Sequence, residues 1–97
     1  MSGQVIVVAK IVAKKETVDS VKAECLKLIE PTRKEDGCVR YMLHQSLDNP
    51  ATFLFVETWA SEAALEQHVK TDHLQGFIQA LDGQVDELTI DKTVEIA

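Results

Sequence analysis

The pattern of hydrophobic and polar positions predicts a strand followed by a helix at the start of the chain. Residues 4–13 are β-branched and almost continuously apolar, which is typical of a strand buried on both faces. Residues 15–35 change to helical spacing, with polar side chains on the opposite side of the wheel. Pro31 predicts a kink or a shifted final turn within this helix, and Gly37 can adopt the left-handed conformation that ends it.

The middle of the chain has the pattern of a hairpin. Residues 38–47 and 52–59 are predicted strands, and Asp48-Asn49-Pro50-Ala51 between them is a strong turn signal. This connection is longer than a two-residue hairpin loop, so we expect an antiparallel pair joined by a longer loop.

The last third of the chain predicts helices and a final strand. Residues 61–81 have helical spacing, with Ser61 as N-cap and a slip of the apolar phase at Thr71-Asp72, which predicts two consecutive helices. Residues 86–96 alternate apolar and polar side chains, as a strand with one dry face does. The order βαββαβ predicts a single α+β domain over residues 1–97, with a ferredoxin-like, four-stranded antiparallel sheet and its helices on one face.

Two of the predicted strands are apolar on both faces, although the two helical segments can cover only one face of the sheet. In residues 4–13, Val5, Val7, Ala9 and Ile11 lie on one face and Ile6, Val8 and Val12 on the other. In residues 52–59, Leu54 and Val56 lie on one face and Phe53, Phe55 and Trp59 on the other. Soluble monomers rarely expose an apolar patch of that size, and a chain of 97 residues is only marginally stable alone. The sequence therefore predicts a homodimer about a twofold axis. If the covering is incomplete, a pocket should remain between the sheet and the helices.

Charge and cysteine usage restrict the remaining possibilities. The chain has 10 basic and 16 acidic side chains, a formal charge of −6 and no basic block, so neither nucleic acid nor an anionic membrane is expected as a partner. No apolar run approaches the roughly 20 residues of a membrane span, and no signal peptide is evident, so we expect a cytoplasmic protein. Cys25 and Cys38 fit no metal or redox spacing and are predicted to be reduced packing residues.

One predicted strand carries a carboxylate among aromatic side chains. Alternation over residues 52–59 places Glu57 on the same face as Phe53, Phe55 and Trp59. Desolvation there should raise the pKa of Glu57, which suits a general acid or base near neutral pH. The alternative is that Glu57 accepts structural hydrogen bonds at the dimer interface, and that Trp59 packs in the core or at an interface rather than in a pocket wall.

The histidines and the single tyrosine are further candidates. His44, His68 and His73 are natural proton carriers, although a surface or capping role is the alternative for each. A continuous helix would not place His68 and His73 on one face, but a break between them could. No third ligand follows at a motif spacing, so no metal site is expected. Tyr41 should point to the helix-packed face, where it could line a pocket.

Five short motifs in a fixed order resemble one known family. They lie at residues 35–41, 48–50, 55–59, 64–68 and 73–77. In order and spacing they resemble the antibiotic biosynthesis monooxygenase family. The resemblance implies a dimeric α/β barrel with a pocket in each subunit, in which phenols or quinols are oxidised by O2 with no metal, flavin or haem. The bound phenolate itself donates the electrons, so such a protein only binds the ring, deprotonates it and excludes water.

The resemblance also implies roles for individual residues. Glu57 or His68 would be the base or a hydrogen-bond anchor, and His73 matches a second family histidine. Trp59, Phe53 and Phe55 would form ring-facing walls. Phe55 stands where the polyketide-oxidising members have an asparagine, so a small quinol or phenol is the expected substrate. Ala9 and Ile78 replace the asparagine and histidine of the haem-degrading branch, so haem degradation is not expected.

The sequence is also compatible with two other functions. One is isomerisation of a phosphorylated, sugar-like signal, which needs a cationic anchor for the phosphate. Arg40 and Lys10 are the only basic residues on the strands before the last. The other is a non-catalytic, dimeric binding or stress protein, in which Glu57 and the histidines are structural. A shared fold does not decide among these functions.

Overall fold

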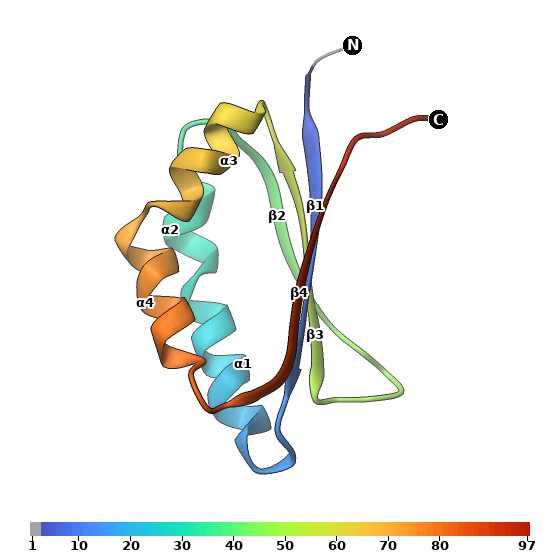
Figure 1. The fold of residues 1–97 in the computed structure, drawn as a ribbon, viewed down its shortest axis with the longest axis vertical. Coiled ribbons are helices and arrows are strands. Elements are labelled where there is room, and N and C mark those ends of the chain that lie inside the picture. The colour runs from blue at the N-terminus through green and yellow to red at the C-terminus, as the bar shows by residue number, and fades with distance from the viewer. Residues whose placement is uncertain (1–2) are drawn as a thin grey trace.

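The computed structural model describes residues 3–97 and has the α+β, ferredoxin-like architecture that the pattern predicts (Figure 1). In chain order, its elements are β1 (Val5–Ala13), the short 3-10 helix η1 (Lys15–Thr17), α1 (Val18–Lys27), α2 (Ile29–Arg33), β2 (Cys38–Gln45), β3 (Thr52–Trp59), α3 (Glu62–Val69), α4 (Asp72–Ala80) and β4 (Val85–Thr93). The four strands form one antiparallel sheet in the order β2-β3-β1-β4. All the helices lie on one face of this sheet.

The central strands place one row of side chains under the helices. Along β1, odd-numbered residues from Val5 to Ala13 are buried and the residues between them are half-buried. In β3, Glu57 pairs with Val7 of β1 on one side and with Tyr41 of β2 on the other. Glu57 therefore lies in the middle of the sheet, on its helix-covered face. Its burial matches that of Phe53, Phe55 and Trp59, with which the alternation predicts that it shares a face.

The first helical segment is interrupted earlier than Pro31. α1 ends at Lys27 and α2 begins at Ile29, so that Pro31 lies inside α2. Proline has no N–H to donate to the carbonyl of Lys27, four residues before it, and its ring crowds that carbonyl. The chain responds at Leu28, whose N–H donates to Cys25 O at 3.2 Å in a tighter turn. The predicted kink is real, but its position was wrong by three residues.

Strand ends differ from the prediction where pairing stops. β2 ends at Gln45 rather than at residue 47, and the loop that follows is closed by bonds between Ser46 N and Thr52 O and between Thr52 N and Asn49 O, both 2.9 Å. β4 ends at Thr93 rather than at residue 96, because its only neighbour, β1, supplies its last partner at Ile6.

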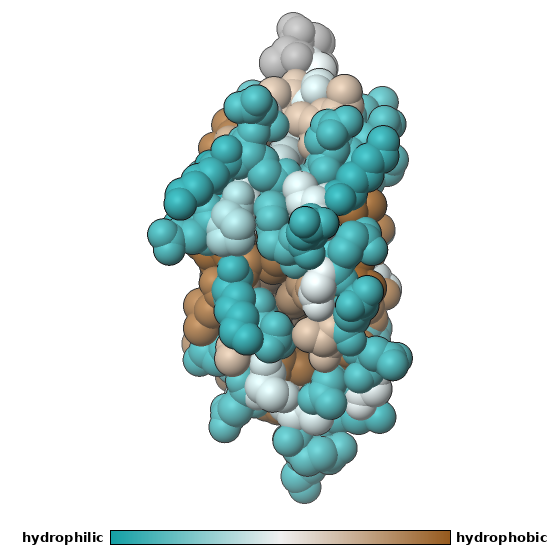
Figure 2. All heavy atoms as spheres, turned by 90° about the vertical axis from the view of Figure 1, so that its left-hand side faces the viewer, coloured by the Kyte–Doolittle hydropathy of each residue, from teal (hydrophilic) through white to brown (hydrophobic). Residues whose placement is uncertain are grey.

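The two faces of the molecule have different surfaces. Hydrophilic side chains predominate over the solvent side of the helix layer, with hydrophobic side chains visible between them (Figure 2). In the described part of the chain, residues 3–97, no helix covers the opposite face of the sheet (Figure 1). The half-buried side chains of that face include Ile6, Val8, Val12, Met42, Leu54 and Val56. Within residues 3–97, no helix is long and apolar enough to span a membrane.

Both cysteines are free thiols. Cys25 is fully buried beneath α1, and burial raises its pKa to about 12. Cys38 is half-buried at the start of β2. Their packing positions agree with the expectation from their spacing.

Candidate functional site

A cavity of about 140 Å³ lies between the sheet and the helices, where a pocket was expected. Its wall is almost entirely apolar, with Tyr41, Glu57 and His68 as the polar exceptions. The other lining residues are Val7, Ala9, Ile11, Leu28, Phe55, Leu65, Val69, Leu74, Phe77, Ile78, Leu88 and Ile90. An apolar chamber with a few convergent polar groups is the usual form of a small-molecule site.

Glu57 is the acidic group of this cavity. Its side chain is 5% exposed, and Oε1 accepts a hydrogen bond of 2.8 Å from the indole Nε1–H of Trp59. Burial raises the pKa of Glu57 to about 7, although the bond from Trp59 favours the carboxylate and lowers it. Oε2 makes no hydrogen bond to residues 3–97 and is available to a ligand. The group is therefore suited to exchange a proton near neutral pH.

Aromatic rings surround this carboxyl group. The ring of Tyr41 lies 5.1 Å from that of Phe55 and meets that of His68 edge-on at 5.7 Å. The indole of Trp59 lies 4.6 Å from the imidazole of His68. Burial raises the pKa of Tyr41 far above its ordinary value, so its hydroxyl stays protonated. These rings form a rigid, polarisable wall that suits a flat ligand.

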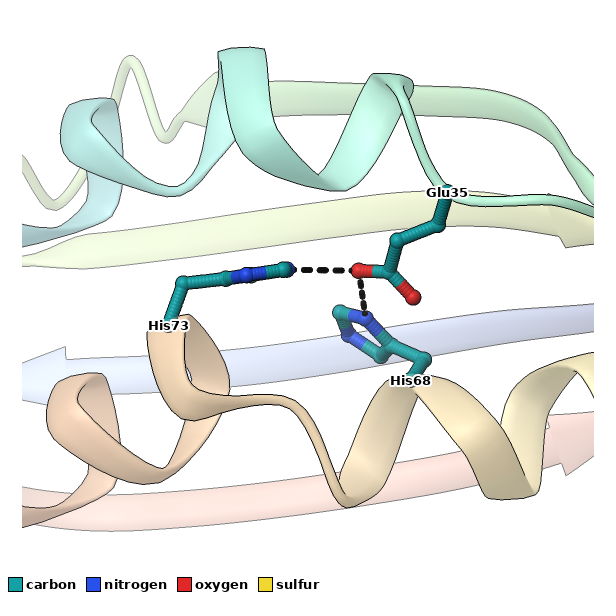
Figure 3. Close-up of side chains that lie close together, drawn as sticks. All are labelled: Glu35, His68 and His73. Carbon is teal, nitrogen blue, oxygen red and sulfur yellow. Dashed lines mark hydrogen bonds and ion pairs between the residues drawn. The ribbon is translucent and has the colours of Figure 1, made fainter.

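His68 belongs at the same time to a second cluster, with Glu35 and His73 (Figure 3). Oε2 of Glu35 lies 2.8 Å from Nδ1 of His68 and 2.6 Å from Nε2 of His73. Glu35 comes from the turn between α2 and β2, His68 from the last turn of α3, and His73 from the first turn of α4. Three segments thus meet at one carboxylate oxygen.

The break between α3 and α4 brings the two histidines together. Thr71 is the N-cap of α4: its hydroxyl accepts from the N–H of Leu74 at 3.3 Å and donates to the carbonyl of His68 at 2.8 Å. This cap restarts the helix with a new phase. The imidazoles of His68 and His73 consequently face the same carboxylate, as the predicted break allowed.

The hydrogen bond to Glu35 also orients the imidazole of His68. Since Glu35 Oε2 accepts, Nδ1 of His68 carries the proton and Nε2 keeps its lone pair. Burial lowers the pKa of His68, and the hydrogen bond and charge of Glu35 oppose this shift. Nε2 makes no hydrogen bond within residues 3–97, and His68 lines the cavity. A neutral imidazole is therefore held ready to accept a hydrogen bond.

Most of the residues singled out in the sequence lie at or next to this cavity. Glu57, His68, Tyr41 and Phe55 line it. Trp59 is fully buried behind Glu57 and His68, which it contacts, rather than in the lining itself. His73 does not line the cavity, but it contacts the site through Glu35 and through the ring of His68, whose centroid lies 6.2 Å away.

Two predicted residues lie elsewhere, and one residue was missed. Phe53 is buried further along β3 and does not line the cavity, and His44 is exposed on the opposite face of β2. Glu35 was not singled out as a functional residue. A signal in the sequence is its place at the head of the motif 35–41, two residues before Gly37, a residue suited to a tight turn.

Comparison with known proteins identifies the family. The family model described as "Antibiotic biosynthesis monooxygenase" matches residues 4–80, which is most of the chain. The chain belongs to the antibiotic biosynthesis monooxygenase family. Among curated members, it is 32% identical over 74 residues to "Putative monooxygenase YcnE" of Bacillus subtilis, covering 76% of this chain and 78% of that one. It is 32% identical over 73 residues to "Probable quinol monooxygenase YgiN" of Escherichia coli, covering 66% and 69%.

The chain is also similar to a longer protein and to a protein of known crystal structure. The chain is 31% identical over 75 residues to the uncharacterised protein sll1783 of Synechocystis, and the match spans 77% of this chain but only 51% of that protein. The crystal structure of PA3566 from Pseudomonas aeruginosa superposes with a TM-score of 0.94 at 31% identity, covering 100% of this chain and 98% of that one. The family's fold is thus present in full, and the relatives' names support a monooxygenase-type function.

Proposed function

We propose that this protein is a cofactor-independent monooxygenase that oxidises a small quinol or phenol with O2. The observation that supports it most directly is Glu57, a buried carboxyl with a pKa of about 7 in an otherwise mostly apolar cavity, whose lining includes the rings of Tyr41 and Phe55. An ordinary phenol has a pKa of about 10, so it needs such a base to ionise at neutral pH.

The size of the cavity favours a substrate with one aromatic ring. An apolar cavity of about 150 Å³ in another protein accepts benzene. The chamber here, about 140 Å³, is therefore matched to one ring rather than to a polycyclic system. One ring hydroxyl would meet Oε2 of Glu57, and a second could donate to Nε2 of His68.

The proposed reaction balances without an added reductant. Glu57 takes the phenolic proton, and the electron-rich phenolate transfers electrons to O2. One oxygen atom then adds to the ring and the other leaves as water, so that a quinol and O2 give a hydroxyquinone and water. The role of the protein is to ionise the ring, hold it in place and exclude bulk water.

The lining of the cavity gives little support to the isomerase alternative. A phosphorylated substrate needs a cationic anchor, and no Lys or Arg lines the cavity within residues 3–97. Lys10 pairs with Glu87 at 3.4 Å, and Arg40 is exposed. Both lie on the face of the sheet that is turned away from the cavity.

We further propose that the working unit is a homodimer. The uncovered sheet face carries the apolar row that begins with Ile6 and Val8, and a second copy is its simplest cover. At the edge of the cavity, Leu88 and Ile90 of β4 are 43% and 61% exposed. A second copy that also covered β4 would close the cavity to water. Sedimentation at micromolar concentration tests this, and a monomer throughout would contradict it.

Oxygen uptake tests the proposed reaction. We would supply chelator-treated protein with single-ring and two-ring quinols and correct for autoxidation. We expect protein-dependent uptake, faster with a single ring, that is lost in Glu57→Gln and kept in the control Glu30→Gln, which removes an exposed carboxylate from α2. Quinol binding in calorimetry without any uptake would instead favour the non-catalytic binding protein.

A further inference from the structure

The cluster of Glu35, His68 and His73 has the composition of a metal site. Each residue offers one ligand atom, and these atoms all lie within 4.8 Å of one another. They are two imidazole nitrogens and one carboxylate oxygen. We propose that Glu35, His68 and His73 bind a divalent transition-metal ion of the zinc class. This inference does not depend on the proposed function and assigns the ion no step in the oxidation.

The donor set suits such an ion by number and type. Zn²⁺ binds imidazole nitrogen and carboxylate oxygen, and two histidines with one glutamate leave a fourth position open to water. Hard cations such as Mg²⁺ and Ca²⁺ prefer sites built from oxygen alone. The cluster therefore favours Zn²⁺ and its neighbours in the first transition row.

The charge balance around Glu35 also favours a cation. Its side chain is only 12% exposed, and within residues 3–97 its ion-pair contacts within 4.0 Å are the two imidazoles, with no Lys or Arg among them. A carboxylate removed from water normally has a cationic partner. A divalent ion would supply that charge, and the 26% exposure of the His73 side chain leaves a route from solvent.

Binding of a metal ion requires the three ligand atoms to change their spacing. With bonds of about 2.0–2.1 Å, tetrahedral geometry separates neighbouring ligand atoms by about 3.3 Å. The present separations from Glu35 Oε2 are 2.8 Å to His68 Nδ1 and 2.6 Å to His73 Nε2. Glu35 Oε2 must therefore move away from both nitrogens by roughly half an ångström. The two nitrogens, which lie within 4.8 Å of each other, must reach the same spacing of about 3.3 Å.

Metal binding would leave a distinct spectroscopic signature. The ion needs the lone pairs of His68 Nδ1 and His73 Nε2, the two atoms that carry protons when they donate to Glu35. His68 would then keep its proton on Nε2, and the group that it presents to the cavity would change from an acceptor to a donor. Imidazole ¹⁵N chemical shifts report this change of tautomer without any measurement of activity.

Sequence spacing alone gave no sign of this site. No third ligand follows His73 at a motif spacing, and Glu35 lies 33 residues before His68. The turn at Gly37 brings it there. A Cβ at Gly37 would lie 2.5 Å from that of Ala64 on α3, so the absence of a side chain allows the α2–β2 turn to approach α3.

Zinc titration of the whole chain tests the proposal. Chelator-stripped protein with reduced thiols would be titrated with ZnCl2 by calorimetry, and the bound metal counted after dialysis. We expect one ion per chain, and affinity at least tenfold lower in Glu35→Gln and in His73→Gln. The histidine tautomers should change with zinc in the wild type. Co²⁺ should give visible absorption bands typical of a four-coordinate site.

Matched controls separate this site from incidental binding. His44→Gln removes an exposed histidine from the opposite face, Glu30→Gln an exposed carboxylate, and Cys38→Ser a nearby thiol. All three should bind zinc as the wild type does, and circular dichroism should show that every variant is folded. The proposal is wrong if no stoichiometric binding occurs, or if the Glu35 and His73 variants bind as tightly as the controls.

Discussion

The indole Nε1–H of Trp59 donates a 2.8 Å hydrogen bond to Oε1 of Glu57, two residues earlier on the same face of β3. This bond occupies one oxygen of a buried carboxyl that lines the cavity, and the other oxygen makes no hydrogen bond to residues 3–97. It favours the ionised form, while burial favours the protonated form, and burial is the larger effect. The balance brings the pKa of Glu57 to about 7, where one group can both take up and release a proton.

Glu57 should make the folded protein less stable as the pH rises. Because its pKa is raised from 4.5 to about 7 on folding, its full contribution is present below about pH 4.5 and is lost as the pH passes through 7. The loss amounts to about 3 kcal/mol. Glu57→Gln keeps an oxygen for Trp59 and removes the titration. We therefore expect this variant to be more stable than the wild type at pH 8 in urea unfolding at equal protein concentration. Parallel stability curves for the two proteins between pH 4.5 and 8 would contradict this.

Replacing Trp59 should move the pKa of Glu57 further upward. Trp59→Phe keeps an aromatic ring but removes the donor to Oε1. The carboxylate then loses its hydrogen bond, so the pKa should rise above the wild-type value by on the order of one unit. A ¹³C NMR titration of the Glu57 carboxyl measures it directly. Phe55→Leu, which removes a ring but no donor, should leave the pKa nearly unchanged, and a fall in Trp59→Phe would refute the argument.

Gly37 and Gly76 should respond to alanine in opposite ways. Gly37 has φ of +84°, and a Cβ there would meet the Ala64 side chain at 2.5 Å. Gly37→Ala should therefore cost about 1–3 kcal/mol of unfolding free energy. Gly76 is exposed within α4 and has nothing within 4 Å, so Gly76→Ala should stabilise by about 1 kcal/mol. Chemical unfolding measures the free energy of unfolding of both variants. If alanine changed it equally at the two positions, the close approach at Gly37 would be unimportant.

Thr71 should stabilise the start of α4 through its hydroxyl. Thr71→Ala removes both the cap to Leu74 N and the bond to His68 O, and should cost about 1 kcal/mol. Thr71→Ser keeps the hydroxyl and should unfold within a few tenths of a kcal/mol of the wild type. If the two variants proved equally stable, the hydroxyl would not hold the helix junction.

Local patterns were sufficient to predict the framework of this fold. Alternation along β1 and β3, the cap at Ser61 and the phase slip near Thr71 each depend on neighbours in the sequence, and each predicted its element correctly. The side-chain oxygen of Ser61 accepts from the N–H of Ala64 at 3.1 Å, as a cap does. The errors lie at the ends of the strands and at Pro31. The length of a strand depends on its pairing partners, and the helix is interrupted at Leu28 rather than at Pro31.

The site was only partly predictable, for a physical reason. Glu57 could be recognised because alternation alone places it among aromatic residues. The contact of Glu35 with His68 could not be recognised in this way, because it depends on how closely the α2–β2 turn approaches α3. Phe53, Phe55 and Trp59 share the face of Glu57, but only Phe55 lines the cavity. Which ring does so depends on the helices that pack over this face.

The pH dependence of quinol-dependent oxygen uptake tests the central claim most directly, namely that Glu57 is the base. With chelator-treated protein, we expect the rate to rise with ionisation of Glu57, near its pKa of about 7, and to reach a plateau above it. In Glu57→Gln the rate should fall by about 10²–10⁴-fold and that pH step should vanish. A Glu57→Gln variant with the wild-type rate and the same pH profile would show that another group ionises the substrate.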